Sequence, residues 1–139
     1  MDAEELGEIH SPFDLMVGTE VLSNDPDDAR LRVKVRDELR QPIGLVHGGV
    51  LSTLVESVCS RATAMAVIDE GMVAMGQSIS VSFVRPITEG HVEVRARAPH
   101  RGRTTWVWEC EVLDAEQRLC ATAMMTIAVR PAPQRFKLS

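Results

Sequence analysis

One segment, residues 50–68, is the only long helical stretch that the sequence predicts. When its residues are placed at steps of about 100°, most of the apolar side chains fall on one broad arc. These are Val50, Leu51, Leu54, Val55, Val58, Ala62, Met65 and Ala66. At about 1.5 Å per residue such a helix is roughly 30 Å long, enough to cross a sheet of several strands. We therefore expect the apolar arc to pack on a sheet built from the rest of the chain.

After Gly71 the spacing of the apolar residues changes to two, which is typical of strands that bury one face. This alternation defines four long strands, within residues 78–83, 92–98, 105–112 and 119–129. Two shorter strands are expected near residues 19–22 and 31–35, joined by a turn at residues 24–27. Four consecutive long strands with short links predict an antiparallel meander. The predicted fold class is α+β, with one long central helix on a curved antiparallel sheet of about six strands.

The 139 residues are enough for one domain and too few for two. We expect a loosely attached lead-in at residues 1–18 with one helical turn near Pro12, the domain at residues 19–130, and a mobile tail at residues 131–139. The net charge of −5 argues against a nucleic-acid partner. No unbroken run reaches the roughly eighteen apolar residues of a membrane span, so no membrane partner is expected.

The beginning of the chain is acidic and lacks the basic-then-apolar pattern of a signal peptide. Three cysteines, Cys59, Cys110 and Cys120, show no paired spacing and are expected to be reduced thiols. Both observations favour a cytoplasmic protein.

The loop before the long helix, residues 41–49, ends in His47-Gly48-Gly49. Two glycines at the start of a helix leave backbone N–H groups open to a ligand, because no Cβ shields them. These N–H groups have no partner inside the helix, and the helix dipole adds partial positive charge there. The loop is therefore a candidate site for an anion, or for an oxygen that becomes one during a reaction.

The arc of the helix opposite the apolar one carries small hydroxyl side chains around a single carboxylate, Glu56. The members of this arc are Ser52, Thr53, Glu56, Ser57, Ser60 and Thr63. A solvated helix face normally carries several Lys and Glu residues, whereas residues 50–68 hold only Glu56 and Arg61 as charges. This composition favours contact with a ligand or another subunit. The alternative is that Glu56 is an ordinary surface glutamate.

The pattern Gly44-x-x-His47-Gly48-Gly49, with Glu56 nine positions after His47, resembles the hotdog-fold acyl-CoA thioesterases of the PaaI-like group. The closest branch has a glutamate at this position and includes dihydroxynaphthoyl-CoA hydrolases and 4-hydroxybenzoyl-CoA thioesterases. The segments 83–86 and 102–103 also fit, and the resemblance covers roughly residues 31–129. Two features depart from it: the turn at residues 114–117 lacks the usual glycine, and Phe83 stands where some relatives have a polar residue.

The resemblance implies a hotdog fold and hydrolysis of an acyl-CoA to the free acid and CoA, without a metal or another cofactor. It also implies a homodimer or homotetramer whose active site is shared between two subunits. Glu56 would act as the nucleophile or as the general base. The Gly48 N–H would polarise the thioester carbonyl, and Gly49 would lie on the substrate side of the loop.

Three other residues have a catalytic interpretation and a plainer one. Gln41 resembles a glutamine that orients water or the thioester, but it also suits a loop-capping amide. Ser60, one turn after Glu56, would hold the carboxylate or a water by a hydrogen bond, or fill a helix contact. His47 would contact the thioester oxygen or fix the loop. No second His or Cys stands at the spacing of a metal ligand, so His47 is not expected to bind one.

CoA carries phosphates, which predicts a basic rim around the site. The candidates are Arg85, after one strand, and the cluster His100, Arg101 and Arg103 at the bend between two others. The alternative for the cluster is a solvated hairpin tip.

Two other functions compete with hydrolysis. One is a module that binds an acyl-CoA or an acyl carrier without reacting, and the presence of Glu56 argues against it. The other is a hotdog dehydratase, which uses a His and an Asp in a differently spaced motif that this sequence lacks. The resemblance favours an aromatic acyl group, and a medium-chain aliphatic acyl group is the main alternative.

Overall fold

The computed structural model describes residues 1–133, so residues 134–139 of the predicted tail lie outside the described part of the chain. Two short helices, α1 (Ala3–Glu8) and α2 (Pro12–Val17), precede the long helix α3 (Gly48–Val67). Short 3-10 turns lie at η1 (Asp37–Leu39) and η2 (Ile68–Glu70). The strands are β1 (Glu20–Ser23), β2 (Ala29–Lys34), β3 (Met72–Phe83), β4 (His91–Arg101), β5 (Thr105–Leu113) and β6 (Leu119–Pro131).

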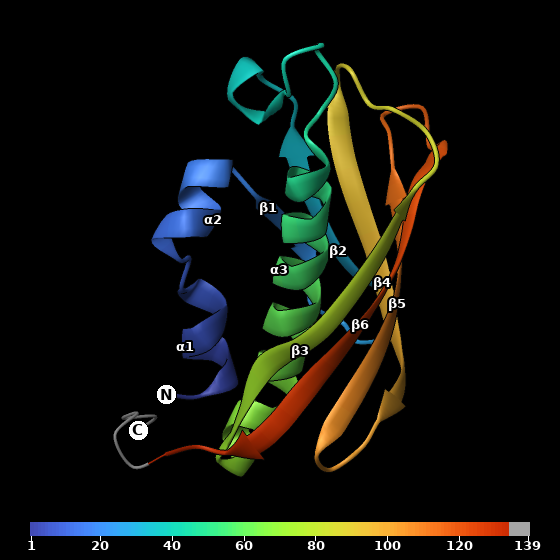
Figure 1. Cartoon of the computed structure of the whole chain (residues 1–139). Helices are drawn as coiled ribbons and strands as arrows, with labels where there is room; N and C mark the ends of the chain where they lie inside the picture. The colour runs from blue at the N-terminus through green and yellow to red at the C-terminus, as the bar shows by residue number, and fades with distance from the viewer. Residues whose placement is uncertain (134–139) are drawn as a thin grey trace.

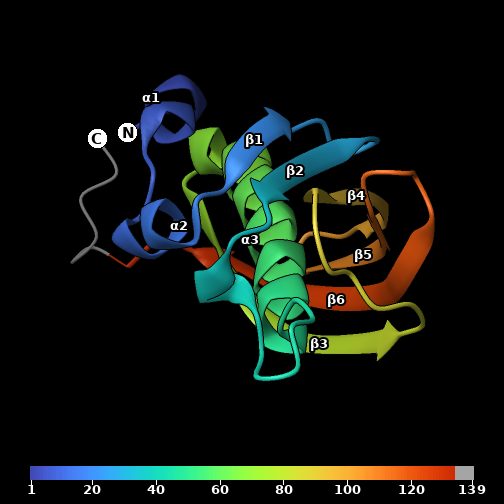
Figure 2. The same ribbon diagram turned by 90° about the horizontal axis from the view of Figure 1, so that it is seen from above.

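The six strands form one antiparallel sheet in the order β1-β2-β4-β5-β6-β3. Seen from above, the sheet curves around α3, which runs through its concave side (Figure 2). The expectation of one long helix on a curved antiparallel sheet of about six strands is thus confirmed. The short strand pair at the beginning of the sheet is also confirmed, as β1 and β2.

The predicted meander of four strands is wrong at its first member. β3 pairs with β6 at the far edge of the sheet, where Ile79 lies opposite Met125, and not with β4. The link between β3 and β4, residues 84–90, is much longer than a two-residue hairpin and carries the chain across to a distant strand. Alternation identifies the residues of a strand, but it does not identify the neighbouring strand.

The core lies between α3 and the sheet. The side chains of α3 that are buried are Leu51, Leu54, Val55, Val58, Cys59, Ala62, Thr63 and Val67. Two helix residues are therefore placed differently from the prediction, because Thr63 is buried and Ala66 is exposed. The Thr63 hydroxyl donates to the Cys59 carbonyl (2.8 Å) and accepts from the Trp108 indole N–H (2.8 Å), so its burial leaves no polar group unpaired.

By length and composition alone, the stretch from Gly48 to Glu70 is long and apolar enough to cross a membrane. Isolated polar residues interrupt this stretch, so it contains no unbroken apolar run of that length. Half of the most apolar part of this stretch is buried inside the fold. A helix that packs in the core of a globular protein is apolar because it is buried there, so the composition of this stretch does not by itself indicate a membrane span.

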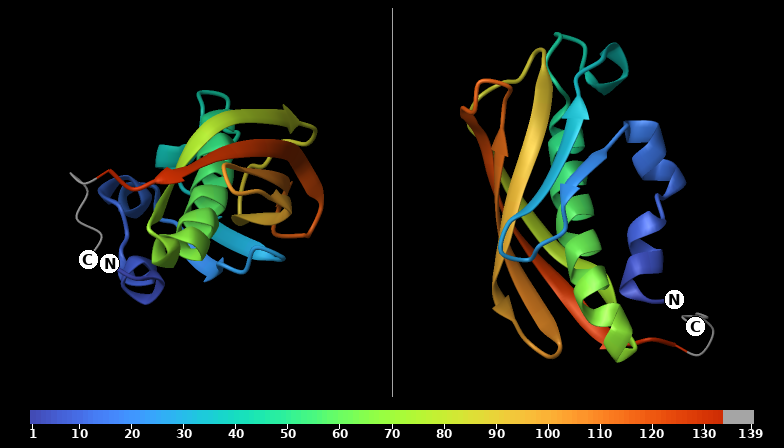
Figure 3. Two further views of the ribbon diagram at one scale, coloured as in Figure 1. Left: turned by 90° about the horizontal axis from the view of Figure 1, so that it is seen from below. Right: turned by 180° about the vertical axis from the view of Figure 1, so that it is seen from behind.

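Residues 1–18 contain two helices rather than the single predicted turn, and they are not loosely attached. Each helix begins at a side-chain cap, because Asp2 accepts from the Glu5 N–H (2.8 Å) and Ser11 accepts from the Asp14 N–H (3.0 Å). The Ala3 N–H also donates to an oxygen of Asp69 (3.1 Å), which joins α1 to η2. Both helices lie along the side of α3 that faces away from the sheet (Figures 1 and 3).

The outer edge of β3 is free over twelve residues within the described chain. Most of its side chains are exposed on both faces, including the large apolar side chains of Met75, Ile79 and Phe83. A long, apolar, unpaired edge is a template for pairing with another strand. β3 therefore has the character of a strand that another chain covers.

Candidate functional site

The loop before α3 is held by short-range hydrogen bonds. The Gln41 N–H donates to the Leu45 carbonyl (2.8 Å), and the Gly44 N–H donates to the Gln41 carbonyl (2.9 Å). Gly44 has φ +94°, a conformation that favours glycine. The side-chain oxygen of Gln41 accepts from the Ile43 N–H (2.7 Å), which favours the loop-capping interpretation of this residue in the single chain.

His47 is the N-cap of α3. Its Nδ1 accepts from the Gly49 N–H (2.9 Å), and its carbonyl accepts from the Val50 N–H (2.9 Å). His47 therefore fixes the loop and at the same time occupies the N–H of Gly49. The first three N–H groups of α3 belong to Gly48, Gly49 and Val50. Among them, only the Gly48 N–H has no hydrogen-bond partner among residues 1–133. The predicted role of Gly48 is thus open to it, whereas Gly49 has no free N–H to offer a substrate.

The Gly48 backbone lies directly against the ring of Phe83 at the end of β3. A Cβ added at Gly48 would stand 3.0 Å from the Cζ of Phe83, so only glycine fits without a shift of the ring. Gly48, Gln41, Phe83 and Arg85 line one cavity of about 410 Å³. The free N–H of Gly48 therefore lies in an apolar cleft with one arginine at its rim.

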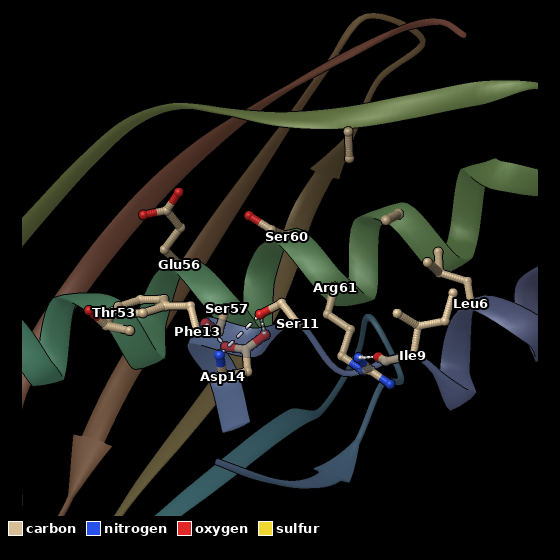
Figure 4. Close-up of a pocket in the computed structure, with 12 residues that line it drawn as sticks. Leu6, Ile9, Ser11, Phe13, Asp14, Thr53, Glu56, Ser57, Ser60 and Arg61 are labelled. Carbon is tan, nitrogen blue, oxygen red and sulfur yellow. Dashed lines mark hydrogen bonds between the residues drawn. The ribbon is translucent and has the colours of Figure 1, made fainter. Parts of the chain in front are cut away.

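Glu56 lies on the opposite arc of α3, as predicted, in a second cavity of about 440 Å³. Its carboxylate points toward β3, where a Cβ added at Gly76 would stand 3.3 Å from Oε1 (Figure 4). The side chain is exposed, and it has no hydrogen-bond partner in the described part of the chain. Ser60 points to the same side of α3, but within residues 1–133 it is not hydrogen-bonded to Glu56.

The sequence interpretation missed Gly76, although a glycine inside a strand pattern is a sign of a bulge or of a close approach. Both occur here, because the pairing register of β3 with β6 shifts between Gly76 and Ser78. A Cβ at Gly76 would stand 2.8 Å from the Met125 methyl group and 3.3 Å from the Glu56 carboxylate, so these two side chains occupy the space that a larger residue would fill.

The sequence interpretation also missed the N-terminal segment, which forms one side of the Glu56 cavity. Leu6, Ile9 and Phe13 line this cavity together with Glu56 and Ser60 (Figure 4). Leu6 lies in α1, Ile9 lies between the two helices with an extended backbone, and Phe13 lies in α2, so no single helical period in the sequence links the three side chains.

The two predicted halves of the reaction centre do not meet within one chain. Glu56 and Gly48 are eight residues apart on the same helix, a separation of about 12 Å along its axis. They also line different cavities. A thioester carbonyl bound at the Gly48 N–H is therefore beyond the reach of the carboxylate of the same chain.

The basic cluster lies at the β4–β5 hairpin, at the end of α3 opposite to Gly48 (Figure 3, right). The Arg101 guanidinium pairs with Asp27, donates to the Ala98 carbonyl (3.0 Å) and lies 5.9 Å from the Trp106 ring. Arg101 is thus engaged within the fold. Arg103 borders a cavity of about 520 Å³ and has no ion pair or hydrogen bond in the described residues, and His100 is exposed beside it. Of the basic candidates, only Arg85 shares a cavity with Gly48.

The cysteines do not provide a nucleophile. All three are free and buried. Burial raises the pKa of Cys59 far above its ordinary value, and the nearby Cys110 thiol, 3.4 Å away, raises it further. A buried thiol does not reach a substrate bound in a surface cavity, and a neutral thiol such as that of Cys59 is a poor nucleophile.

Comparison with known proteins identifies the family of the chain. A family model described as the Thioesterase superfamily matches residues 43–121. A 1,4-dihydroxy-2-naphthoyl-CoA hydrolase of Listeria monocytogenes is 31% identical over 114 residues, which cover 82% of this chain and 92% of the relative. A thioesterase from Haemophilus influenzae has a similar structure, with a TM-score of 0.84, 28% identity, and coverage of 94% of this chain and 92% of the other.

The PaaI protein of E. coli, from the phenylacetic acid degradation operon, shares the fold at 20% identity, with a TM-score of 0.82 and coverage of 94% of this chain and 92% of the other. The family model covers more than half of the chain, and the Listeria relative is similar over most of its own length. The chain is therefore a hotdog-fold hydrolase of the Thioesterase superfamily.

Proposed function

We propose that this protein hydrolyses acyl-CoA thioesters in a site made by two subunits, with Glu56 from one and the Gly48 N–H from the other. The observation that carries the proposal is the separation of the two groups. Each lies open in a cavity of its own, and α3 holds them about 12 Å apart in one chain. The name of the Listeria relative supports CoA as the thiol part of the substrate and an aromatic acyl group.

In the proposed reaction, the Gly48 N–H and the positive end of the α3 dipole bind the thioester oxygen. That oxygen gains negative charge as the carbonyl carbon is attacked, so the interaction strengthens in the transition state. Glu56 either attacks the carbon and expels the CoA thiolate, leaving an anhydride that water hydrolyses, or removes a proton from an attacking water. Gln41 and Ser60 are proposed to orient the water or the carboxylate. Both routes give the free acid and CoA.

The second subunit is proposed to pair through the free edge of β3. Glu56 lies against Gly76, and Gly48 lies against Phe83, seven residues further along the same strand. Antiparallel pairing of β3 with its own copy, centred on Ser80, brings the bulge that begins at Gly76 of one subunit close to the partner's Phe83. The carboxylate of one subunit then faces the Gly48 N–H of the other, twice per dimer.

We expect light scattering at micromolar concentration to give a dimer, or a tetramer formed from two such dimers. The physical reason is the twelve-residue apolar edge, which a monomer would leave exposed to water. The mass of a single chain would contradict the proposed site, because a monomer has no complete one.

Arg85 is the first candidate for a CoA phosphate, because it lies at the rim of the cavity that holds the Gly48 N–H. The cluster of His100, Arg101 and Arg103 is the second candidate, and within it Arg103 has the least engaged side chain. Gly49 contributes to the shape of the loop rather than a donor.

The direct test of the function is a panel of CoA thioesters assayed by release of free thiol. We expect turnover of an aromatic acyl-CoA, such as benzoyl-CoA, and slower turnover of a medium-chain aliphatic one. Binding of these thioesters without release of thiol would contradict hydrolysis and favour the non-catalytic binding module.

A further inference from the structure

We propose that three apolar side chains of the N-terminal segment, Leu6, Ile9 and Phe13, form the acyl-binding wall of the Glu56 cavity, and that Phe13 sets a preference for bulky apolar acyl groups over short ones. This inference rests on the proposed hydrolysis and adds the class of acyl group and the segment that selects it. The name acyl-binding wall is used below for these three side chains.

Two parts of the chain supply most of the lining of the cavity. α3 supplies Glu56, Ser60 and Thr53, and the acyl-binding wall supplies the apolar side chains of Leu6, Ile9 and Phe13 (Figure 4). Ser11 and Asp14 also line the cavity from the N-terminal segment, and the carboxylate of Asp14 accepts hydrogen bonds from the Ser11 and Ser57 hydroxyls. A thioester whose carbonyl carbon is near Glu56 therefore has apolar surface available for the rest of its acyl group on the wall. The volume of about 440 Å³ is within the range of sites that hold drug-sized molecules, and an acetyl group would leave most of it empty.

Of the three wall residues, Phe13 has the largest exposed fraction. It is 53% exposed, although it lines the cavity beside the candidate carboxylate. An aromatic ring left half in water gains free energy when a ligand covers it. Leu15, on the same helix, is 67% exposed but does not line the cavity. A comparison of substitutions at Phe13 and Leu15 therefore distinguishes a role in the cavity from the effect of removing any exposed apolar side chain of α2.

The segment that carries the wall is fixed to α3 by specific contacts, so the wall is formed before a substrate arrives. The Ser57 hydroxyl donates to Asp14 (2.9 Å), and Arg61 donates to the carbonyls of Ile9 (2.8 Å) and Gly7 (Figure 4). α1 also packs closely on α3, since a Cβ at Gly7 would stand 3.2 Å from the Met65 methyl group. A preformed apolar surface binds without the entropic cost of ordering the segment.

The test compares Phe13→Ala with the matched control Leu15→Ala on two thioesters, benzoyl-CoA and acetyl-CoA. We expect Phe13→Ala to lower kcat/KM for benzoyl-CoA by about tenfold and to leave acetyl-CoA nearly unchanged, because only the larger acyl group reaches the ring. Phe13→Leu keeps an apolar side chain and should restore most of the loss. Leu15→Ala should change neither value. Melting temperature and light scattering check the fold and assembly of each variant.

Equal losses on both thioesters, or no loss on benzoyl-CoA in a folded Phe13→Ala protein, would overturn the inference. The failure of the proposed function looks different, because the unmodified protein would then release thiol from no thioester. Where turnover of acetyl-CoA is too slow to measure, calorimetric binding of both thioesters to the Glu56→Gln protein gives the same comparison. A loss of affinity for benzoyl-CoA on adding Phe13→Ala supports the wall, and unchanged affinity contradicts it.

Discussion

Replacing Glu56 by glutamine is expected to lower kcat on an aromatic acyl-CoA by at least about a hundredfold, the lower end for loss of a general base. Glutamine keeps the size and most of the hydrogen bonding of the side chain, but it neither attacks a thioester nor accepts a proton from water. The loss should appear in kcat rather than in KM, because Glu56 acts on the reacting carbon and not on the CoA part. Thiol release under saturating substrate measures it.

The fold should survive this substitution, because Glu56 is exposed in a cavity and has no hydrogen-bond partner within residues 1–133. Glu70→Gln is a matched control, since Glu70 is also exposed and lies just beyond the far end of α3. An unchanged melting temperature with a large drop in kcat identifies a chemical role. A kcat near that of the unmodified protein would show that Glu56 takes no part in the reaction, and would contradict the proposed mechanism.

Removing the Gly48 N–H is expected to have an effect of similar size. Gly48→Pro eliminates this donor at the first position of α3, where proline is favoured in helices. His47 has φ −61° and ψ 132°, the extended conformation that a residue before proline needs. Loss of one donor to a developing oxyanion typically costs on the order of a hundred- to a thousandfold in rate.

Gly48→Ala is the matched control, because it places a Cβ against Phe83 and keeps the N–H. The nearest atoms belong to the far end of an exposed ring that can move aside, so both variants should fold. The expected result is a much lower kcat for Gly48→Pro than for Gly48→Ala. If the two variants lost the same activity, crowding of Phe83 would account for the effect, and the N–H would have no part in it.

The parts of the fold that the sequence predicted are those encoded by local patterns. The segment His47-Gly48-Gly49 marked the start of α3, and the period-two alternation marked the long strands. The pairing of β3 with β6 was not predicted, because side chains that alternate along residues 78–83 carry no information about their neighbours. The burial of Thr63 was also missed, since it depends on the Trp108 indole, 45 residues away in the sequence.

The sequence predicted the open placement of two groups in the candidate site, but not what surrounds them. Glu56 and the Gly48 N–H are in the open positions that the pattern of residues implied. The wall carried by the N-terminal segment depends on Asp14 meeting Ser57 and on Arg61 meeting backbone carbonyls more than fifty residues away. Such contacts join residues that are far apart in the sequence, so no local pattern predicts them. Arg101 was predicted from the sequence as part of a basic cluster for phosphate binding. In the structure its guanidinium is already paired with Asp27 and hydrogen-bonded to the Ala98 carbonyl.

The central claim is that each reaction centre takes Glu56 from one subunit and the Gly48 N–H from the other. It is tested most directly by co-expressing Glu56→Gln and Gly48→Pro chains with different affinity tags, purifying the mixed dimers through both tags, and measuring thiol release from benzoyl-CoA. In a mixed dimer one site carries both substitutions and the other carries neither, so the account predicts recovery of about half the unmodified rate per dimer, although each parent is nearly inactive. Mixed dimers as inactive as their parents would contradict a shared site.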